Sequence, residues 1–218
     1  MELSNSQITK LGDRLRNDCT KDDLGMLDGF RQTFSKVDEA AYTIIKQVLP
    51  TSKECTITKR KRKTQQSIVD KLRRQKNLRL AQMQDIAGCR IVLNSGIEQA
   101  NEIKSVLVNA LREPWQVESK ERVENGYRAI HIIAKLDKKC YEIQLRTYAQ
   151  DIWANLVESM SDEKNTLKYG GSEQEQPLMK KLIKLAESFR VIDQKAHENN
   201  IEQYQQQIKG AINHVLSH

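Results

Sequence analysis

The chain has 218 residues, of which 38% are hydrophobic and 30% charged, enough for one folded domain with helical extensions and a charged surface. Aromatic residues make up only 5%, which argues against a platform that stacks single-stranded bases, and the four scattered cysteines do not have the spacing of a zinc site. The sequence has no apolar run of about 18 residues and no signal-peptide core, so we expect a cytoplasmic protein without a membrane span.

The first fifty residues predict helices. Apolar residues recur at helical spacing from Ile8 to Leu15, and a polar break follows at 20–23. From Leu24 to Val48 the apolar residues keep a period near 3.6, and the pattern ends at Pro50. These stripes predict buried helix faces, and we assign them no chemistry.

A strongly basic segment comes next. Ten Lys or Arg and one acidic residue, Asp70, lie between Lys59 and Arg79, so this segment alone exceeds the net charge of +7 of the whole chain. We expect a basic loop over 51–63 that leads into a helix around 67–72. Such a cluster is typical of a surface that binds phosphates, nucleic acid or acidic lipid. The alternative is a solvated basic face or a disordered arm.

The middle of the chain predicts a mixed sheet. Ser95 and Glu98 have the spacing of a capping box. In chain order, the patterns predict a strand at 89–93, a helix over 97–110, strands at 115–123, 128–136 and 141–147 with a turn at 137–139, a helix over 152–160, a break at Gly170–Gly171 and two helices after Pro177. This order predicts an α+β fold, with a mixed sheet that carries helices on one face.

Polar residues alternate along the last predicted strand. Glu142, Gln144 and Arg146 fall on one face of it, opposite an apolar set. A hairpin with the preceding strand would bring His131 onto the same face. Buried polar groups are costly unless they are paired, so this face predicts a polar site. The alternative is a solvent-exposed face of an antiparallel sheet.

A second carboxylate precedes the first predicted strand. Asp85 comes three residues before Gly88, a pattern that is also typical of a turn or a cap. Together with Glu142 on a neighbouring strand, Asp85 has the arrangement that presents magnesium to a nucleoside triphosphate. The basic side chains ahead of a helix N-terminus would supply the cations that phosphates need. These features together favour phosphoryl chemistry.

Four segments resemble, in order, the motifs of the RelA/SpoT alarmone synthetases: Lys61–Leu72, Gln84–Val92, Gly126–His131 and Tyr141–Thr147. The resemblance implies a nucleotidyltransferase-like mixed sheet with flanking helices. It also implies transfer of pyrophosphate from ATP to a ribose 3′-hydroxyl, with release of AMP and with Mg²⁺ as cofactor. We expect N-terminal helices over 1–50, the synthetase core over 51–165 and C-terminal helices over 166–218.

The resemblance also implies roles for single residues on the ATP side. Lys63, Ser67 and Lys71 would hold the ATP phosphates. Arg90 would pack against the adenine, opposite a position where the family has Arg and this chain has Lys61; arginine stacks on a ring better than lysine does.

The remaining implied roles concern the metal and the acceptor. Asp85 would bind Mg²⁺, and Glu142 would either aid the metal or accept the proton of the attacking hydroxyl. Tyr127 would stack on the acceptor base. The acceptor's phosphates and ribose would be positioned by His131, Gln144 and Arg146.

The identity of the acceptor is open at this point. The long family members carry a hydrolase domain and regulatory domains for which this chain has neither the length nor the histidines, so we expect a small, synthesis-only member. The stretch 11–16 and the basic segment favour a toxic member of a toxin–antitoxin pair that modifies the 3′-CCA end of tRNA. The alternatives are (p)ppGpp synthesis from GDP or GTP, an adenosine nucleotide as acceptor, or a non-catalytic RNA-binding module. The C-terminal helices would bind an antitoxin, build a homo-oligomer or cap the sheet.

Overall fold

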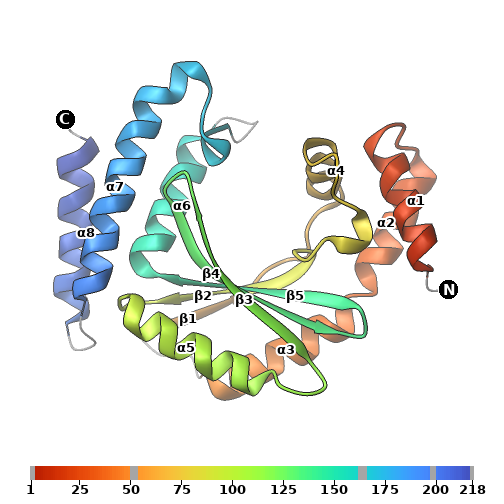
Figure 1. Cartoon of the computed structure of the whole chain (residues 1–218), viewed down its shortest axis with the longest axis horizontal. Helices are drawn as coiled ribbons and strands as arrows, with labels where there is room; N and C mark the ends of the chain where they lie inside the picture. Colours follow the sequence, from red (N-terminus) through yellow and green to blue (C-terminus); the bar gives the residue numbers. More distant parts are fainter. Residues whose placement is uncertain (1–2, 50–53, 162–165, 197–199, 217–218) are drawn as a thin grey trace.

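The computed structural model describes residues 3–49, 54–161, 166–196 and 200–216 and has a five-stranded mixed sheet with helices around it (Figure 1). This confirms the α+β prediction. The helices are α1 (Asn5–Arg16), α2 (Lys21–Gln32), α3 (Ser35–Val48), α4 (Gln65–Arg74), α5 (Ile97–Ala110), α6 (Tyr148–Met160), α7 (Gln176–Lys195) and α8 (Ile201–Leu216). The strands are β1 (Cys55–Lys59), β2 (Ala87–Leu93), β3 (Gln116–Glu124), β4 (Tyr127–Leu136) and β5 (Lys139–Thr147).

The sheet has the strand order β1-β2-β5-β4-β3, with β2 and β5 parallel and the other neighbours antiparallel. Two tight turns join β3 to β4 and β4 to β5. Their central residues, Asn125 with Gly126 and Asp137 with Lys138, all have positive φ, as a two-residue hairpin turn of type I′ requires. The predicted hairpin is therefore present, and it pairs His131 with Gln144.

One face of the sheet is apolar and lies against α3 and α5 (Figure 1). Tyr141, Ile143 and Leu145 of β5 are fully buried in this core. The stripe predicted from the first fifty residues joins the same core, from Ile8 to Ile45. Its period places these apolar side chains on the inner faces of the helices, as expected from the pattern.

The other face of the sheet lies between two groups of helices. In Figure 1, α6, α7 and α8 rise at one end of the sheet and α4, with α1 and α2, at the other. The helices α6 to α8 share a second apolar cluster that contains Trp153, Leu182 and Phe189. As predicted, helices α3 and α5 cover one face of the sheet. The opposite face is flanked by helices at both ends.

Two local predictions were wrong. The loop predicted over 51–63 contains β1, an edge strand in which only Cys55 is buried, so the sequence gives a weak apolar signal there. The helical pattern predicted from Leu24 to Val48 is present as two helices, which meet at 33–34, where the Thr33 hydroxyl donates to the carbonyl of Phe30. The helix α5 begins after Gly96 without a side-chain cap, so Ser95 forms no capping box.

The predicted boundary at 50–51 falls outside the described residues and the one at 165–166 falls at the edge of such a stretch, so the division into three segments remains a prediction. Within the described residues, none of the helices has the length and apolar character needed to cross a bilayer.

Candidate active site

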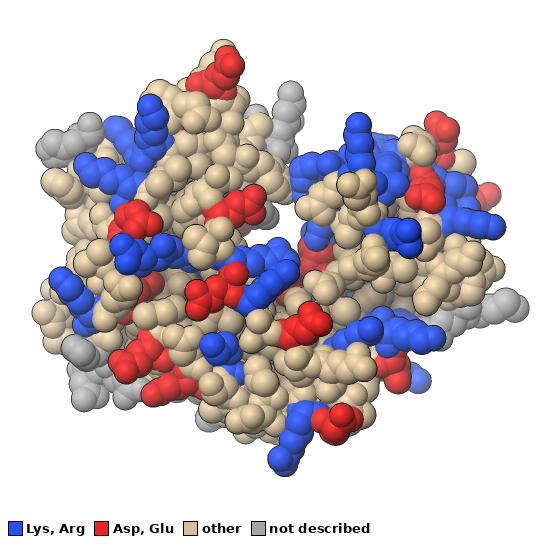
Figure 2. All heavy atoms as spheres, viewed as in Figure 1, with Lys and Arg blue, Asp and Glu red and all other residues tan. Residues whose placement is uncertain are grey.

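The polar face of β4 and β5 lies on the side of the sheet from which α4 and α6 rise (Figure 1). Figure 2 shows the molecule hollowed between these two parts, with basic and acidic side chains close together around the hollow. Glu142, Gln144 and Arg146 project from β5, as predicted, and all three are buried. Their neighbour on β4 is His131, which is 3% exposed.

Glu142 is the centre of this polar face. Its Oε1 atom lies 2.8 Å from His131 Nδ1, and its Oε2 atom accepts from Arg60 Nη1 at 3.1 Å and from Gln144 Nε2 at 3.0 Å. Burial alone would raise the pKa of Glu142, but the bond to His131 and the charge of Arg60 outweigh burial and lower the pKa to about 2. Glu142 is therefore an anion at neutral pH although its side chain is almost fully buried.

The protonation of His131 follows from its two partners. Burial lowers the pKa of His131 below its ordinary value, which leaves the ring neutral at pH 7. A carboxylate only accepts hydrogen bonds, so Nδ1 carries the proton and donates it to Glu142. Nε2 then accepts from the Tyr127 hydroxyl at 3.0 Å. The neutral His131 ring thus connects Glu142 to Tyr127 through two hydrogen bonds.

Tyr127 and Arg146 complete the chain of contacts. The Arg146 guanidinium donates to the Tyr127 hydroxyl at 3.3 Å and lies 5.4 Å from the centroid of the Tyr127 ring. It also donates to Gln144 Oε1 at 3.4 Å. The four residues predicted to bind the acceptor, Tyr127, His131, Gln144 and Arg146, are therefore in one connected network with Glu142.

Gly126 belongs to the turn that positions Tyr127 beside this network. Gly126 has a φ of +88°, and a Cβ atom there would meet the Trp153 ring of α6 at 2.7 Å. Both the backbone conformation and the close contact require glycine. The turn before Tyr127 is thereby packed directly against α6.

Asp85 forms a second charged cluster, with two lysines. Lys63 Nζ lies 3.1 Å from its Oδ2 atom and Lys71 Nζ 2.8 Å from its Oδ1 atom. Burial would raise the pKa of Asp85, but the charges of Lys71 and Lys63 outweigh it and hold the pKa below its ordinary value. Asp85 lies just before β2, whose Gly88 is paired with Glu142 of β5, and the charge of Glu142 acts on the pKa of Asp85 in the raising direction.

Main-chain contacts explain why the basic segment reaches this region. After β1 the chain continues beside β2, where Arg60 N donates to the Gly88 carbonyl at 3.0 Å and Lys63 N to the Ile86 carbonyl at 2.8 Å. Gly88 allows β2 to approach β5, because a Cβ atom at Gly88 would lie 2.2 Å from the Glu142 carbonyl oxygen. Arg60 and Lys63 are thereby fixed near the two carboxylates.

The sequence reasoning missed Asp151, the fourth residue of α6. Its Oδ1 atom accepts from Arg146 Nη1 at 2.8 Å and lies 3.5 Å from Arg90 Nη1. One carboxylate thus connects an arginine predicted to bind ATP with an arginine predicted to bind the acceptor. The signal that was available is the position of Asp151 in the first turn of a helix that directly follows the polar strand.

Two predicted ATP ligands lie apart from these clusters. Ser67 is exposed in the first turn of α4, where its hydroxyl accepts from Thr64 at 2.8 Å. Lys61 is exposed and makes no ion pair or hydrogen bond with the described residues. The neighbouring Arg62 is directed away, toward the Ser35 hydroxyl at 2.9 Å. The arginine of this stretch that reaches the hollow is Arg60.

The donor set fits a hard divalent cation at Asp85 better than at Glu142. Within the described residues no group of three or more His, Cys, Asp or Glu forms a ready metal site. The Asp85 oxygens contact flexible lysine ammonium groups, which a bound phosphate can attract away, and carboxylate oxygen is the ligand that Mg²⁺ prefers. Both Glu142 oxygens are already held by His131, Arg60 and Gln144.

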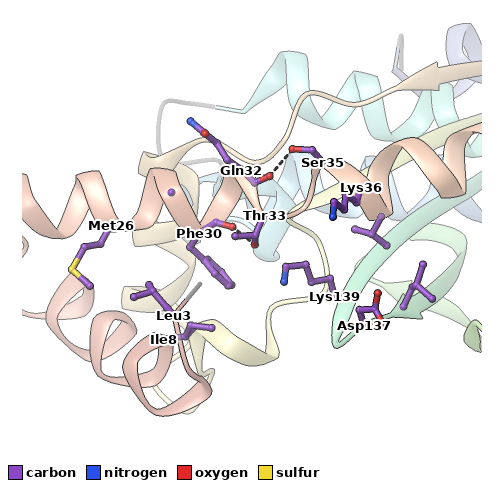
Figure 3. Close-up of a pocket in the computed structure, with 13 residues that line it drawn as sticks. Leu3, Ile8, Met26, Phe30, Gln32, Thr33, Ser35, Lys36, Asp137 and Lys139 are labelled. Atoms are coloured by element: carbon purple, nitrogen blue, oxygen red, sulfur yellow. Dashed lines mark hydrogen bonds between the residues drawn. The ribbon is translucent and has the colours of Figure 1, made fainter. Parts of the chain in front are cut away.

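A cavity of about 950 Å³ lies elsewhere, between α1, α2, the start of α3 and the β4–β5 turn. Figure 3 shows Leu3, Ile8 and Phe30 on one side of it and Lys36 and Lys139 on the other. None of the predicted site residues lines this cavity. The chemistry is therefore assigned to the charged hollow and not to this cavity.

A comparison with known protein families identifies the central region of the chain. Residues 59–166 match the family model described as a region found in RelA / SpoT proteins. This segment is a RelA/SpoT region, which confirms the resemblance drawn from the four motifs. Uncharacterized proteins of Mycobacterium bovis and Mycobacterium tuberculosis are 36% identical over 104 residues. The match covers 46% of this chain and 37% of those relatives, so the chain spans little more than a third of their length.

Solved structures share the fold. The small alarmone synthetase 1 of Bacillus subtilis, bound to its product pppGpp, has a TM-score of 0.58 and 23% identity and covers 88% of this chain and 99% of that one. A GTP pyrophosphokinase family protein from Streptococcus pneumoniae has a TM-score of 0.50 and 21% identity, covering 83% and 92%. At these identities the similarity establishes the architecture, and it extends beyond the family region to the flanking helices.

Proposed function

We propose that this protein is a pyrophosphokinase that transfers the β,γ-pyrophosphate of ATP to a ribose 3′-hydroxyl and releases AMP. The proposal is carried by two carboxylates on adjacent parts of the sheet: the lysine-paired Asp85, two residues before β2, and the buried, ionised Glu142 of the neighbouring strand β5. Pyrophosphoryl transfer depends mainly on charge neutralisation and in-line positioning, and this hollow supplies both cations and a proton acceptor.

ATP would bind on the β1 and α4 side of the hollow. Lys63 and Lys71 are near the region where the phosphates would lie, and Ser67 is in the first turn of α4, whose N-terminus favours anions. If the phosphates attracted the lysines, the Asp85 oxygens would be free to hold Mg²⁺, and the bound ion would supply neutralisation of the phosphate charge. On β2, Arg90 would face the adenine, with Lys61 on the other side of the ring.

Glu142 would accept the proton of the attacking hydroxyl. The 3′-oxygen forms a bond to the β-phosphorus, the bond from that phosphorus to the oxygen bridging the α- and β-phosphates breaks, and AMP leaves with that oxygen. Arg60 lowers the pKa of Glu142, so movement of Arg60 toward a bound phosphate would make the carboxylate a stronger base. His131 holds the second carboxylate oxygen in place.

The acceptor would enter on the β4 side, where Tyr127 is available for base stacking and His131, Gln144 and Arg146 for the ribose and phosphates. We favour the 3′-CCA end of tRNA as acceptor, because the basic stretch from Lys59 to Arg79 suits a polyanion larger than a nucleotide. Such an enzyme would inhibit translation and be restrained by an antitoxin protein. The second candidate is (p)ppGpp synthesis from GDP or GTP, which the pppGpp bound to the Bacillus subtilis relative favours.

The experiment that tests the proposal is incubation of the protein with γ-labelled ATP and Mg²⁺ in three parallel reactions, with deacylated tRNA, GDP or GTP, and ADP or ATP as acceptors. We expect release of AMP and label on one acceptor, with tRNA labelled most strongly. The matched control is Glu142→Gln. RNA binding that falls steeply with salt, without AMP release in any reaction, would instead identify a non-catalytic RNA-binding module.

A further inference from the structure

The proposed ATP-binding and acceptor-binding residues lie on different strands and follow one another across the polar face of the sheet. The cations paired with Asp85 lie on the β1 and α4 side, and Glu142 lies on the central strand β5. Tyr127 and His131 are one strand further on, in β4. The remaining strand on that side is the edge strand β3. If ATP occupies the first side, the acceptor reaches Glu142 from the β3 side.

The edge strand carries two cations on this polar face. Lys120 is directly paired with His131, and Arg122 with Ala129, so their side chains lie on the same face as His131. The positive charge of Arg122 contributes to the lowered pKa of His131, which places it near the ring. Neither cation forms an ion pair or hydrogen bond with the described residues.

Their exposure suits a ligand contact. Lys120 is exposed and Arg122 is half-buried, in a strand that is solvent-accessible along most of its length. The other cations of the hollow differ in this respect, because Arg60, Lys63, Lys71 and Arg146 all pair with protein carboxylates. Two unpaired cations next to the network of Glu142 are available to an external anion without loss of an existing bond.

We propose that Lys120 and Arg122 bind phosphate groups of the acceptor and thereby draw its 3′-terminal ribose toward Glu142. The inference rests on the proposed pyrophosphokinase function and extends the acceptor site by one strand. The phosphates belong either to the backbone of an RNA acceptor or to the 5′-phosphates of a nucleotide. Glu118, on the same face and paired with Ile133, limits the cationic stretch on one side, and Glu124 limits it on the other.

The test compares Lys120→Gln/Arg122→Gln with the wild type. We expect the KM for the acceptor to rise about 10-fold or more while the KM for ATP changes less than 2-fold. With tRNA, the slope of log affinity against log salt should fall by about 1 for each lost phosphate contact. With GDP, a loss of affinity equal to that with tRNA would assign the contact to the nucleotide's own phosphates.

The matched control is Lys180→Gln/Lys209→Gln, which removes two exposed cations from α7 and α8. The single variant Lys120→Gln changes only an exposed position. It therefore tests the contact even if replacement of the half-buried Arg122 disturbs folding. Glu118→Gln should act in the opposite direction and lower the acceptor KM. An acceptor KM that stays within 2-fold of the wild type in the double variant would overturn the inference.

Binding measured without ATP separates this inference from the proposed function. If the wild type transfers no label to any acceptor, the proposed function fails. The inference on phosphate binding still stands in that case if the double variant binds deacylated tRNA or GDP at least about 10-fold more weakly than the wild type, and it fails if the two bind equally.

Discussion

The two carboxylates of the hollow are both ionised, but they are held in different ways. Asp85 lies in a loop and contacts two lysine ammonium groups, whose long side chains can turn to another anion. Glu142 lies in the central strand β5 and is fixed by His131, Gln144 and Arg60, and its side chain is 3% exposed. This difference supports the proposal that Asp85 would exchange its lysine partners when substrate binds, while Glu142 would keep its position.

The largest expected effect follows from removing the fixed carboxylate. Glu142→Gln keeps the shape of the side chain but cannot accept a proton, and the loss of a general base lowers kcat by about 10²–10⁴-fold. AMP release from ATP measures the effect, and circular dichroism checks that the protein remains folded. Full activity in this variant would remove Glu142 from the mechanism.

Asp85→Asn tests the exchangeable carboxylate. If Asp85 holds the metal, the Mg²⁺ concentration that gives half-maximal activity should rise at least about 10-fold, because metal affinity depends on the charge of the ligand. In Glu142→Gln the same Mg²⁺ titration should keep its midpoint while the rate is low. Equal shifts in both variants would contradict the division between the two carboxylates.

Two substitutions of Tyr127 distinguish base stacking by its ring from hydrogen bonding by its hydroxyl. Base stacking contributes about 1–3 kcal/mol, so Tyr127→Ala should raise the acceptor KM about 5- to 150-fold and change the ATP KM little. Tyr127→Phe keeps the ring and loses only the contacts of the hydroxyl with His131 and Arg146. If Phe and Ala have the same effect, stacking is not the role of Tyr127.

Asp151 contacts both Arg90 and Arg146, so we expect its replacement to weaken the binding of both substrates. Hydrogen bonds to charged groups contribute about 1.5–3 kcal/mol, so Asp151→Asn should raise the KM for ATP and for the acceptor about 10-fold each. The control is Asn155→Ala, which removes a bond to the other Asp151 oxygen and leaves both arginines in place. A change in only one KM would argue against a shared positioning role.

The smallest effect concerns stability and pH. The folded-state pKa of Glu142 is lowered from 4.5 to about 2, so its ionisation stabilises the folded protein above pH 4.5 and this contribution is lost as the pH falls toward 2. The contribution is at most about 3 kcal/mol. Denaturant unfolding should show that the stability difference between wild type and Glu142→Gln shrinks over this pH range; a constant difference would contradict the lowered pKa.

Alternation and helical period predicted much of the fold and part of the site. The polar face of β5 and its pairing with His131 follow from a two-residue side-chain period and a short turn, both of which are local properties. The sequence pattern did not predict the edge strand β1. This segment has little apolar content of its own and is a strand because it pairs with β2. Asp151 was missed for a similar reason, since an acidic residue in the first turn of a helix is common and its contact with Arg90 crosses the fold.

The sequence by itself determined which residue types face one another across the sheet, because the side-chain period is a local property. It also determined which family the chain resembles, because the order of the motifs can be read directly from the sequence. Only the tertiary structure decided that Arg60, and not Lys61 or Arg62, reaches Glu142, and that Lys63 and Lys71 both converge on Asp85. Within a run of five basic residues the sequence gives no preference. The direction of each side chain was set by the main-chain bonds of Arg60 and Lys63 to β2 and by the packing of α4.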